Sequence, residues 1–326
     1  MNILRFGVLG AARITPAALI KPARNIDEIQ ITRIAARNRD RAEAFANEYG
    51  IPNVSGSYDD LLASTDIDII YNPLPMSLHA EWTIAALRAG KHVLCEKPLA
   101  ANAREAAEMV LVAAVEGRIL GEAFHYRYHP YFQRVLDEVR SGRIGTVTHI
   151  DANFAVTVRQ PDLRWDYATA GGSTMDLGCY PVSWVRQVMG EEPLVSSARA
   201  VVGPPNIDAE LEADLVFPSG ATARVFSSMQ SDERKINMTI IGTEGSIVAD
   251  NPLAPQNGNL LTITTAGGVA SESINTGVSY EYMLRAFVDH IQHGGPYPTQ
   301  GADSIANMAT IDAMYDAAGL PHRGLE

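Results

Sequence analysis

Two short clusters combine residue types that can move a proton beside a small polar molecule. Glu96-Lys97-Pro98 follows the apolar run 92–95, and Asp176-x-Gly178-x-Tyr180 follows the glycine-rich stretch 170–174. A tyrosine hydroxyl can act as acid or base when a nearby cation stabilises its anion. Lowering the pKa of Tyr180 from about 10 to about 7 takes roughly 4 kcal/mol, which one ammonium about 4 Å away supplies at an effective dielectric near 20. Lys97 is therefore sufficient if the fold brings it to Tyr180; a surface lysine and a core tyrosine are the ordinary alternatives.

The second cluster also contains a carboxylate close to Tyr180 in the sequence. Asp176 and Tyr180 are four residues apart, so on a helix their side chains share one face.

A third cluster could hold the phosphates of a dinucleotide. The run Leu4–Leu9 ends in Gly10, and Gly10-x-Ala12-x-x-Thr15 keeps only the first glycine of the fingerprint G-x-G-x-x-G. Alanine at the second position leaves less room than glycine, and an ordinary strand-to-helix turn is the alternative. The place of this turn, after the first strand and before a helix N-terminus, favours a pyrophosphate site.

The end of the second expected strand favours NADP over NAD. An NAD site has an acidic residue there that accepts from the ribose 2′-OH, but this chain has Ala36-Arg37-Asn38-Arg39-Asp40-Arg41. The planar guanidinium groups of Arg37 and Arg41 suit bidentate contact with a 2′-phosphate. The alternative is the solvated first turn of a helix.

The elements that must position these clusters change character along the chain. Strand-like and helix-like segments alternate over residues 1–123, which implies a doubly wound parallel sheet. After Phe124, strand-like runs joined by glycine turns at 218–220 and 242–245 predict a large, mainly antiparallel sheet with an open face. We therefore predict an α/β chain with a Rossmann domain over 1–123 and an α+β domain over 124–326, whose last helices can pack back on the first domain. The expected strands are 4–9, 29–36, 67–71, 92–95, 119–124, 147–158, 194–202, 209–217, 222–229, 236–241 and 260–265.

Composition excludes several other classes of protein. The 326 residues include 26 Lys plus Arg and 38 Asp plus Glu, and a net charge of −12 disfavours binding to nucleic acid or to anionic membranes. No apolar run is long enough to span a bilayer, and the first residues lack the pattern of a signal peptide. Cys95 and Cys179 give no disulfide framework, and His125 and His129 lack the companions of a zinc site. We expect a cytoplasmic protein that binds no metal.

Taken together, these segments resemble the Gfo/Idh/MocA oxidoreductase family over nearly the whole chain. Tyr180 stands where many members have histidine, which makes the chain more similar to the branch of glucose-fructose oxidoreductase and dimeric dihydrodiol dehydrogenase. Residues 36–38 also resemble the 2′-phosphate site of that branch. The matching segments are the turn GVLGAARI, Asn72-Pro73-Leu74-Pro75-x-x-x-His79, Glu96-Lys97-Pro98 and Asp176-x-Gly178-x-Tyr180.

The resemblance implies an NADP-dependent dehydrogenase or reductase that acts on a CH–OH group of a sugar, polyol or cyclic diol. Tyr180 is then the acid/base and Lys97 its catalytic partner. The expected substrate residues are Asp176, His125, Arg127 and Tyr280, for which packing at the domain junction or in the core is the alternative. The expected cofactor-binding residues are Gly10, Ala11, Ala12, Arg13, Ile14, Ala36, Arg37, Asn38, Arg41, Asn72, Pro73, Leu74, His79, Glu96, Lys97, Arg164 and Trp165.

Two other functions stay open at this point. One is a sugar–sugar oxidoreductase that keeps NADP tightly bound, and the other is a non-catalytic NADP-sensing regulatory protein. The presence of both Lys97 and Tyr180 disfavours a sensor, which needs neither. An uncovered sheet face favours association with another protein surface, so we also expect a homodimer or homotetramer formed through the second sheet.

Overall fold

The computed structural model of the chain describes residues 3–203 and 206–324. The chain divides into two compact units. Unit 1 comprises the residues up to Ala100 together with Arg104–His125 and Tyr280–Ile305. Unit 2 comprises Ala101–Ala103, Tyr126–Ser279 and the residues from Ala306 onward. The simpler boundary near residue 123 stays a prediction.

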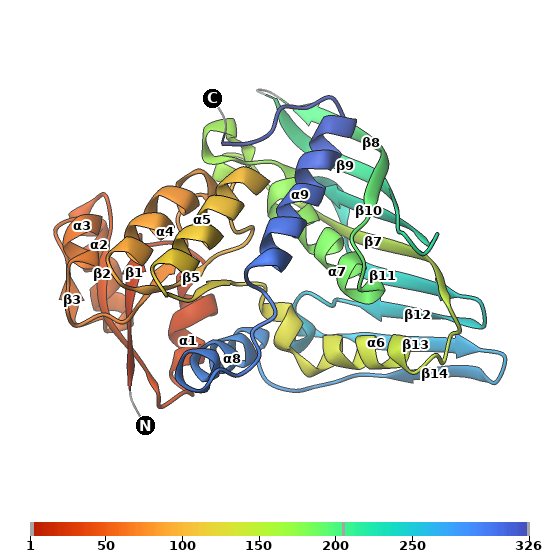
Figure 1. The fold of residues 1–326 in the computed structure, drawn as a ribbon, viewed down its shortest axis with the longest axis horizontal. Helices are drawn as coiled ribbons and strands as arrows, with labels where there is room; N and C mark the ends of the chain where they lie inside the picture. Colours follow the sequence, from red (N-terminus) through yellow and green to blue (C-terminus); the bar gives the residue numbers. More distant parts are fainter. Residues whose placement is uncertain (1–2, 204–205, 325–326) are drawn as a thin grey trace. The chain divides into compact units, whose positions relative to one another are not determined.

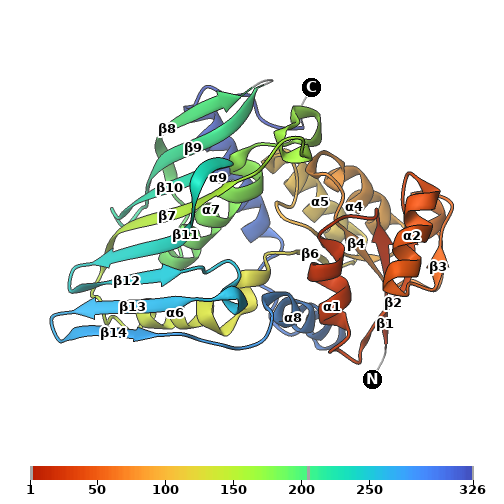
Figure 2. The ribbon, with the colours of Figure 1, turned by 180° about the vertical axis from the view of Figure 1, so that it is seen from behind.

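Unit 1 is built on a parallel sheet, as its alternating sequence predicts. In the described chain its strand order is β3-β2-β1-β4-β5-β6, and every neighbouring pair is parallel (Figures 1 and 2). The order reverses between β1 and β4, the point at which open α/β sheets bind ligands beyond the carboxyl ends of their strands. The strands are β1 (Leu4–Leu9), β2 (Ile29–Ala35), β3 (Asn53–Val54), β4 (Ile69–Asn72), β5 (His92–Cys95) and β6 (Leu120–Glu122).

Helices cover this sheet because its central strands are apolar on both faces. The side chains of β4 are all buried, as expected of a parallel strand between two helical layers. A segment distant in sequence completes the cover: a Cβ on Gly121 of β6 would lie 2.7 Å from the rings of Phe287 and Tyr297. The helices wholly or mostly in this unit are η1 (Pro16–Ile20), α1 (Lys21–Ala23), α2 (Arg39–Tyr49), α3 (Tyr58–Leu62), η2 (Met76–Leu78), α4 (His79–Arg88), α5 (Ala103–Val115) and α8 (Ser279–His293).

Unit 2 is built on a larger sheet of mixed direction. Its described strands follow the order β14-β13-β12-β11-β7-β10-β9-β8, with antiparallel neighbours except for the parallel pair β7 and β10. The predicted open-faced, mainly antiparallel sheet is thus confirmed. The strands are β7 (Val147–Thr157), β8 (Leu194–Gly203), β9 (Ile207–Val216), β10 (Thr222–Ser228), β11 (Gln230–Gly242), β12 (Gly245–Asp250), β13 (Leu260–Thr265) and β14 (Gly268–Glu272).

The two faces of the second sheet differ in chemistry. Helices α6 (Pro130–Arg140), α7 (Cys179–Met189) and the unit 2 part of α9 (Ala302–Ala317) lie on one face (Figures 1 and 2). The other face has a ladder of charges, in which Arg224 pairs with Glu212 and, at 3.2 Å, with Asp151. Among residues 3–203 and 206–324, no helix has both the length and the apolar character needed to cross a bilayer.

Candidate active site

The turn after β1 has the shape of a phosphate-binding loop. Gly10 has a φ of +78°, which disfavours other residues, and a Cβ there would lie 3.0 Å from Leu74 Cδ2. The predicted residues Ala11 to Ile14 follow, and η1 begins as a π-helix at Pro16. The N–H groups of Ala11 and Ala12 donate to no oxygen of the described chain. They are therefore available to an anion at the start of a helix.

Two arginines lie beside this turn. Arg41 Nη2 donates to the carbonyl oxygen of Ala11 at 3.1 Å, and Asn38 caps α2 by accepting from the Arg41 N–H at 2.8 Å. Burial raises the pKa of Tyr58, whereas the cations Arg37 and Arg41 act in the opposite direction. Neither guanidinium pairs with a carboxylate in the ranges that the structure describes. Exposed, uncompensated arginines beside a helix N-terminus fit the 2′-phosphate and pyrophosphate of NADP.

The backbone around Lys97 is held from several sides in unit 1. The hydroxyl of Tyr71 donates to Glu96 Oε1 at 2.7 Å, and the Glu96 N–H donates to the Asn72 carbonyl at 3.0 Å. On the other side of Lys97, the Leu99 N–H donates to a carboxylate oxygen of Glu122 at 2.8 Å. Lys97 thus leaves the end of β5 from a segment whose main chain is fixed on both sides.

His79 connects the loop after β4 to the same segment. Its ring nitrogens lie 2.9 Å from the Leu74 carbonyl oxygen and 3.0 Å from that of Pro98, and the ring is buried. A neutral imidazole has one N–H, so it donates a hydrogen bond to only one of these oxygens. Burial of the ring lowers the pKa of His79 to about 4. The hydrogen bonds to the two carbonyl oxygens favour the charged form and act in the opposite direction. His79, a predicted cofactor residue, therefore lies between the loop after β4 and the segment that bears Lys97.

Unit 2 positions Asp176 on an unusual helical turn. Residues Thr174–Gly178 form the π-helix η6, which continues directly into α7. Asp176 Oδ2 pairs with Arg164 Nε at 2.6 Å, and this carboxylate raises the pKa of the guanidinium. π-turns are frequent at functional sites. The structure therefore pairs Arg164, a predicted cofactor residue, with Asp176, a predicted substrate residue.

The loop that leads into η6 leaves no room for side chains. A Cβ on Gly171 would lie 2.4 Å from the carbonyl oxygen of Arg164, and Gly172 has a φ of +137°. The Gly172 N–H also donates to the Arg164 carbonyl at 2.9 Å. The backbone of the loop therefore packs directly on the residue that holds Asp176.

Tyr180 lies in the first turn of α7 and is only 4% exposed. Its ring centroid is 5.7 Å from that of Phe154, 6.0 Å from that of Tyr126 and 6.3 Å from that of Trp184. These rings restrict the orientation of the phenol. Since Tyr180 belongs to unit 2 and Lys97 to unit 1, their pairing stays a prediction.

The remaining predicted substrate residues fall into two groups. His125 and Tyr280, 155 positions apart in the printed sequence, stack with ring centroids 3.9 Å apart in unit 1. Arg127 is buried in unit 2, where its carbonyl oxygen accepts from Gln133 at 2.5 Å. Trp165 donates from its indole N–H to the Val158 carbonyl at 2.9 Å. The aromatic pair is thus a direct contact between two predicted substrate residues.

Sequence reasoning did not find several residues that support these predicted sites. Tyr58 beside the two arginines and Tyr71 beside Glu96 have the sequence context of ordinary core residues. Asp208 and Arg323, which pair at 2.7 Å in unit 2, are two further residues of this kind. A tyrosine that ends a buried strand directly before Asn72-Pro73 was the one available signal for Tyr71.

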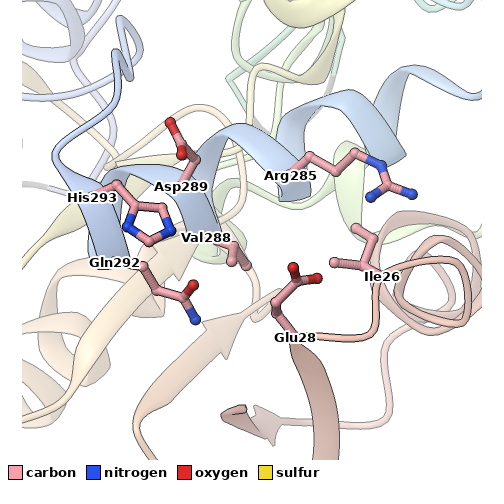
Figure 3. A pocket seen from close by; sticks show the side chains of 7 residues that line it. All are labelled: Ile26, Glu28, Arg285, Val288, Asp289, Gln292 and His293. Carbon is pink, nitrogen blue, oxygen red and sulfur yellow. The ribbon is translucent and has the colours of Figure 1, made fainter. Parts of the chain in front are cut away.

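A small pocket of about 140 Å³ lies elsewhere in unit 1. It opens between the segment just before β2 and helix α8, and Glu28 and polar side chains of α8 line it (Figure 3). None of its lining residues is a predicted site residue, so it is separate from the expected chemistry. Those residues are Ile26, Glu28, Arg285, Val288, Asp289, Gln292 and His293.

Two segments of the chain match one oxidoreductase family. Residues 4–124 match the family's NAD-binding Rossmann fold, and residues 132–248 match the GFO/IDH/MocA C-terminal domain. D-xylose 1-dehydrogenase (NADP(+)) 2 of Haloferax volcanii is 38% identical over 97% of both chains. Trans-1,2-dihydrobenzene-1,2-diol dehydrogenase of Xenopus tropicalis is 33% identical over 67% of this chain and 66% of its own.

Solved structures extend the likeness to the fold of nearly the whole chain. The aldose-aldose oxidoreductase of Caulobacter crescentus, complexed with glycerol, has a TM-score of 0.90 and 25% identity, and the match covers 98% of both chains. A 3-ketoreductase of Actinomadura kijaniata, complexed with NADP and TDP-benzene, has a TM-score of 0.89 and 28% identity. That match covers 97% of this chain and 98% of the reductase.

The buried His79 predicts a specific loss of stability in mild acid. Its pKa is about 4 in the folded protein and near 6.5 in an unfolded chain, so below about pH 6.5 the unfolded state takes up a proton that the folded state does not. Stability therefore falls as the pH falls from about 6.5 to 4, by about 3 kcal/mol from this residue. The measurement is urea unfolding of the wild type and His79→Gln across this range. Equal pH dependence in the two proteins would contradict the assignment.

Proposed function

The chain belongs to the Gfo/Idh/MocA oxidoreductase family, and we propose that it oxidises or reduces a CH–OH carbon of a sugar, polyol or cyclic diol with NADP. The observation that supports this most is the pair of uncompensated arginines, Arg37 and Arg41, beside the turn after β1. The NADP+-linked xylose dehydrogenase that matches 97% of the chain supports the same cofactor and substrate class.

Cofactor binding is assigned to residues that unit 1 holds near one edge of its sheet. The N–H groups after Gly10 would bind the pyrophosphate, because they face no oxygen of the described chain. Arg37 and Arg41 would bind the 2′-phosphate, for which their fixed forks of donors are suited. Asn72 to Leu74, His79 and Glu96 complete the proposed cofactor side, and bound NADP supplies or accepts the hydride.

Proton transfer is assigned to Tyr180. In oxidation its hydroxyl oxygen, as the phenolate, accepts the proton of the substrate hydroxyl, and in reduction the phenol returns that proton to the carbonyl oxygen. The ammonium of Lys97 stabilises the phenolate and donates a hydrogen bond to the reacting oxygen. Tyr71 and Glu122 fix the segment that bears Lys97, which restricts the position of this charge within unit 1.

Asp176 is assigned to substrate orientation. Its carboxylate is held by Arg164 at 2.6 Å, and carboxylate oxygens accept hydrogen bonds from hydroxyl groups. Fixing one neighbouring hydroxyl selects which carbon of the substrate is presented for reaction. The stacked rings of His125 and Tyr280 would provide an apolar wall for the same substrate.

One alternative is also supported by a comparison. The similarity to an aldose-aldose oxidoreductase favours a cycle in which NADP stays bound while two sugars react in turn. The two functions differ in whether NADP is lost during gel filtration of the loaded protein. We also retain the prediction of a homodimer or homotetramer formed through the open sheet face.

The function itself is tested by a single turnover without cofactor release. Protein loaded with NADP+ is mixed with aldoses, inositols and cyclic diols, and absorbance of the reduced nicotinamide is followed. We expect a signal of up to one equivalent with at least one sugar or polyol. Confirmed NADP+ binding with no signal across the panel, and none in the reverse direction with the corresponding ketoses and lactones, would reject the proposal.

Tyr180→Phe tests the acid/base. The variant keeps the ring that packs on Phe154 and loses the hydroxyl, so we expect kcat to fall by about 100-fold or more, with NADP affinity retained. Tyr131→Phe is the matched control, because it also removes a buried tyrosine hydroxyl in unit 2, one that donates to Asp250 and Leu260 carbonyls. Normal turnover by Tyr180→Phe would show that another group transfers the proton.

Arg37→Ala tests the choice of cofactor. Loss of a charged hydrogen bond worth about 1.5–3 kcal/mol should raise the Kd for NADPH by roughly 10- to 100-fold and leave that for NADH nearly unchanged. Arg39→Ala is the control from the same segment, since Arg39 pairs with Glu43 at 2.7 Å. Titrations by nicotinamide fluorescence give both constants. An equal effect on both cofactors would remove the argument for a 2′-phosphate site.

A further inference from the structure

An arginine in the segment after α9 lies at the centre of a buried polar network in unit 2. Arg323 is 0% exposed, and its guanidinium donates to the Gly171 carbonyl at 2.8 Å and to Asp208 Oδ1 at 2.7 Å. Its Cζ lies 4.9 Å from the ring centroid of Tyr167 and 4.4 Å from that of Tyr315. The proposed chemistry assigns no role to this cation.

Asp208 connects the arginine to the glycine-rich loop. Its Oδ1 also accepts from the Tyr315 hydroxyl at 3.1 Å, while Oδ2 accepts from Ser173 Oγ at 3.0 Å and from the Thr174 N–H at 2.7 Å. A Cβ on Gly172 would lie 2.1 Å from Oδ1. The backbone of the loop therefore folds closely around this carboxylate.

An irregularity in the sheet gives Asp208 this orientation. Val201 of β8 pairs with Glu210 of β9, but Val202 pairs with Asp208, so β9 contains one extra residue at this point. Side chains alternate between faces along a strand, and a regular β9 would place Asp208 and Glu210 on the same face. Bulges of this kind redirect a side chain and are frequent next to active sites.

A gain in stability does not explain why this ion pair is buried. Burying an ion pair takes two charges out of water, and an apolar pair of similar volume is often equally stable or more so. Directional bonds to both charges do, however, fix the groups that they bind. Here those groups are the Gly171 carbonyl and the Thr174 N–H, at the two ends of the loop.

The fixed loop leads directly into the proposed substrate site. The Asp176 N–H donates to the Gly172 carbonyl at 3.0 Å, so the turn that bears Asp176 begins on the loop. The same turn continues into α7 and Tyr180. Any displacement of residues 171–174 would therefore move the orienting carboxylate and the first turn of α7.

We propose that Arg323 is a positioning residue for sugar turnover: through Asp208 it fixes residues 171–174, and through them the places of Asp176 and Tyr180. This inference rests on the proposed function. Loosening the network impairs substrate orientation and proton transfer, whereas NADP binding depends mainly on the turn after β1 and on Arg37 and Arg41.

Two substitutions of different severity test the proposal. Arg323→Lys keeps a charge for Asp208 but lacks the fork that also reaches Gly171, and Tyr315→Phe removes only one donor to Asp208. His322→Gln is the control, because the neighbouring His322 side chain pairs with Asp316 instead. Each protein is examined for sugar kcat and KM, NADP+ Kd, Tm and hydrogen–deuterium exchange of peptides covering 171–178.

We expect Arg323→Lys to lower sugar kcat/KM by about tenfold or more, with both kcat and KM affected, and Tyr315→Phe to cause a smaller change in the same direction. Exchange within 171–178 rises in both variants, while NADP+ Kd stays within about threefold of wild type. Unchanged kinetics and exchange would overturn the proposal. So would a uniform rise in exchange with a matching loss of NADP+ affinity, which indicates general destabilisation. If the wild type turns over no substrate, the proposed function fails, and the exchange data alone decide whether Arg323 fixes the loop.

Discussion

Polar groups that fold away from water must find partners inside the protein, and the irregular segments of this structure depend on that constraint. In unit 1, Tyr71 and Glu122 pair with the backbone or side chains of Glu96–Leu99, and His79 lies against the Pro98 carbonyl. In unit 2, Asp208 and Arg323 do the same for residues 171–174. Both segments lack a regular ladder of backbone bonds, and buried side chains take its place.

The parallel sheet also positions the predicted site residues of unit 1. Gly10 follows β1, Arg37 follows β2, Asn72 ends β4 and Lys97 follows β5. Parallel strands end at one edge, and this alone brings residues far apart in sequence to the same edge of the sheet. The sheet thus gives coarse placement, and the buried polar groups give the finer placement that reaction chemistry requires.

The difference between what sequence could and could not predict follows the same division. Strands β1, β5 and β13 agree residue for residue with their predicted ranges, because apolar runs are local signals. Strands β3, β12 and β14 were not predicted; β3 has only two residues and β14 is largely exposed. The network of Arg323 has no local sequence signal. Its partner Gly171 is 152 positions away in the sequence. The orientation of its partner Asp208 depends on a bulge in β9 that the sequence pattern does not predict.

The π-helical turn at Thr174–Gly178 has a consequence for how such a site can evolve. A π-turn closes its hydrogen bonds over five residues where an α-turn closes over four, so it contains one residue more than a regular helix would. Loss of a single codon in this stretch can be absorbed by a return to α-helix, with α7 and its tyrosine left in register. The acidic side chain would then occupy a different angular position around the helix. One short deletion could therefore change the position of Asp176 without altering Tyr180 or the fold around it.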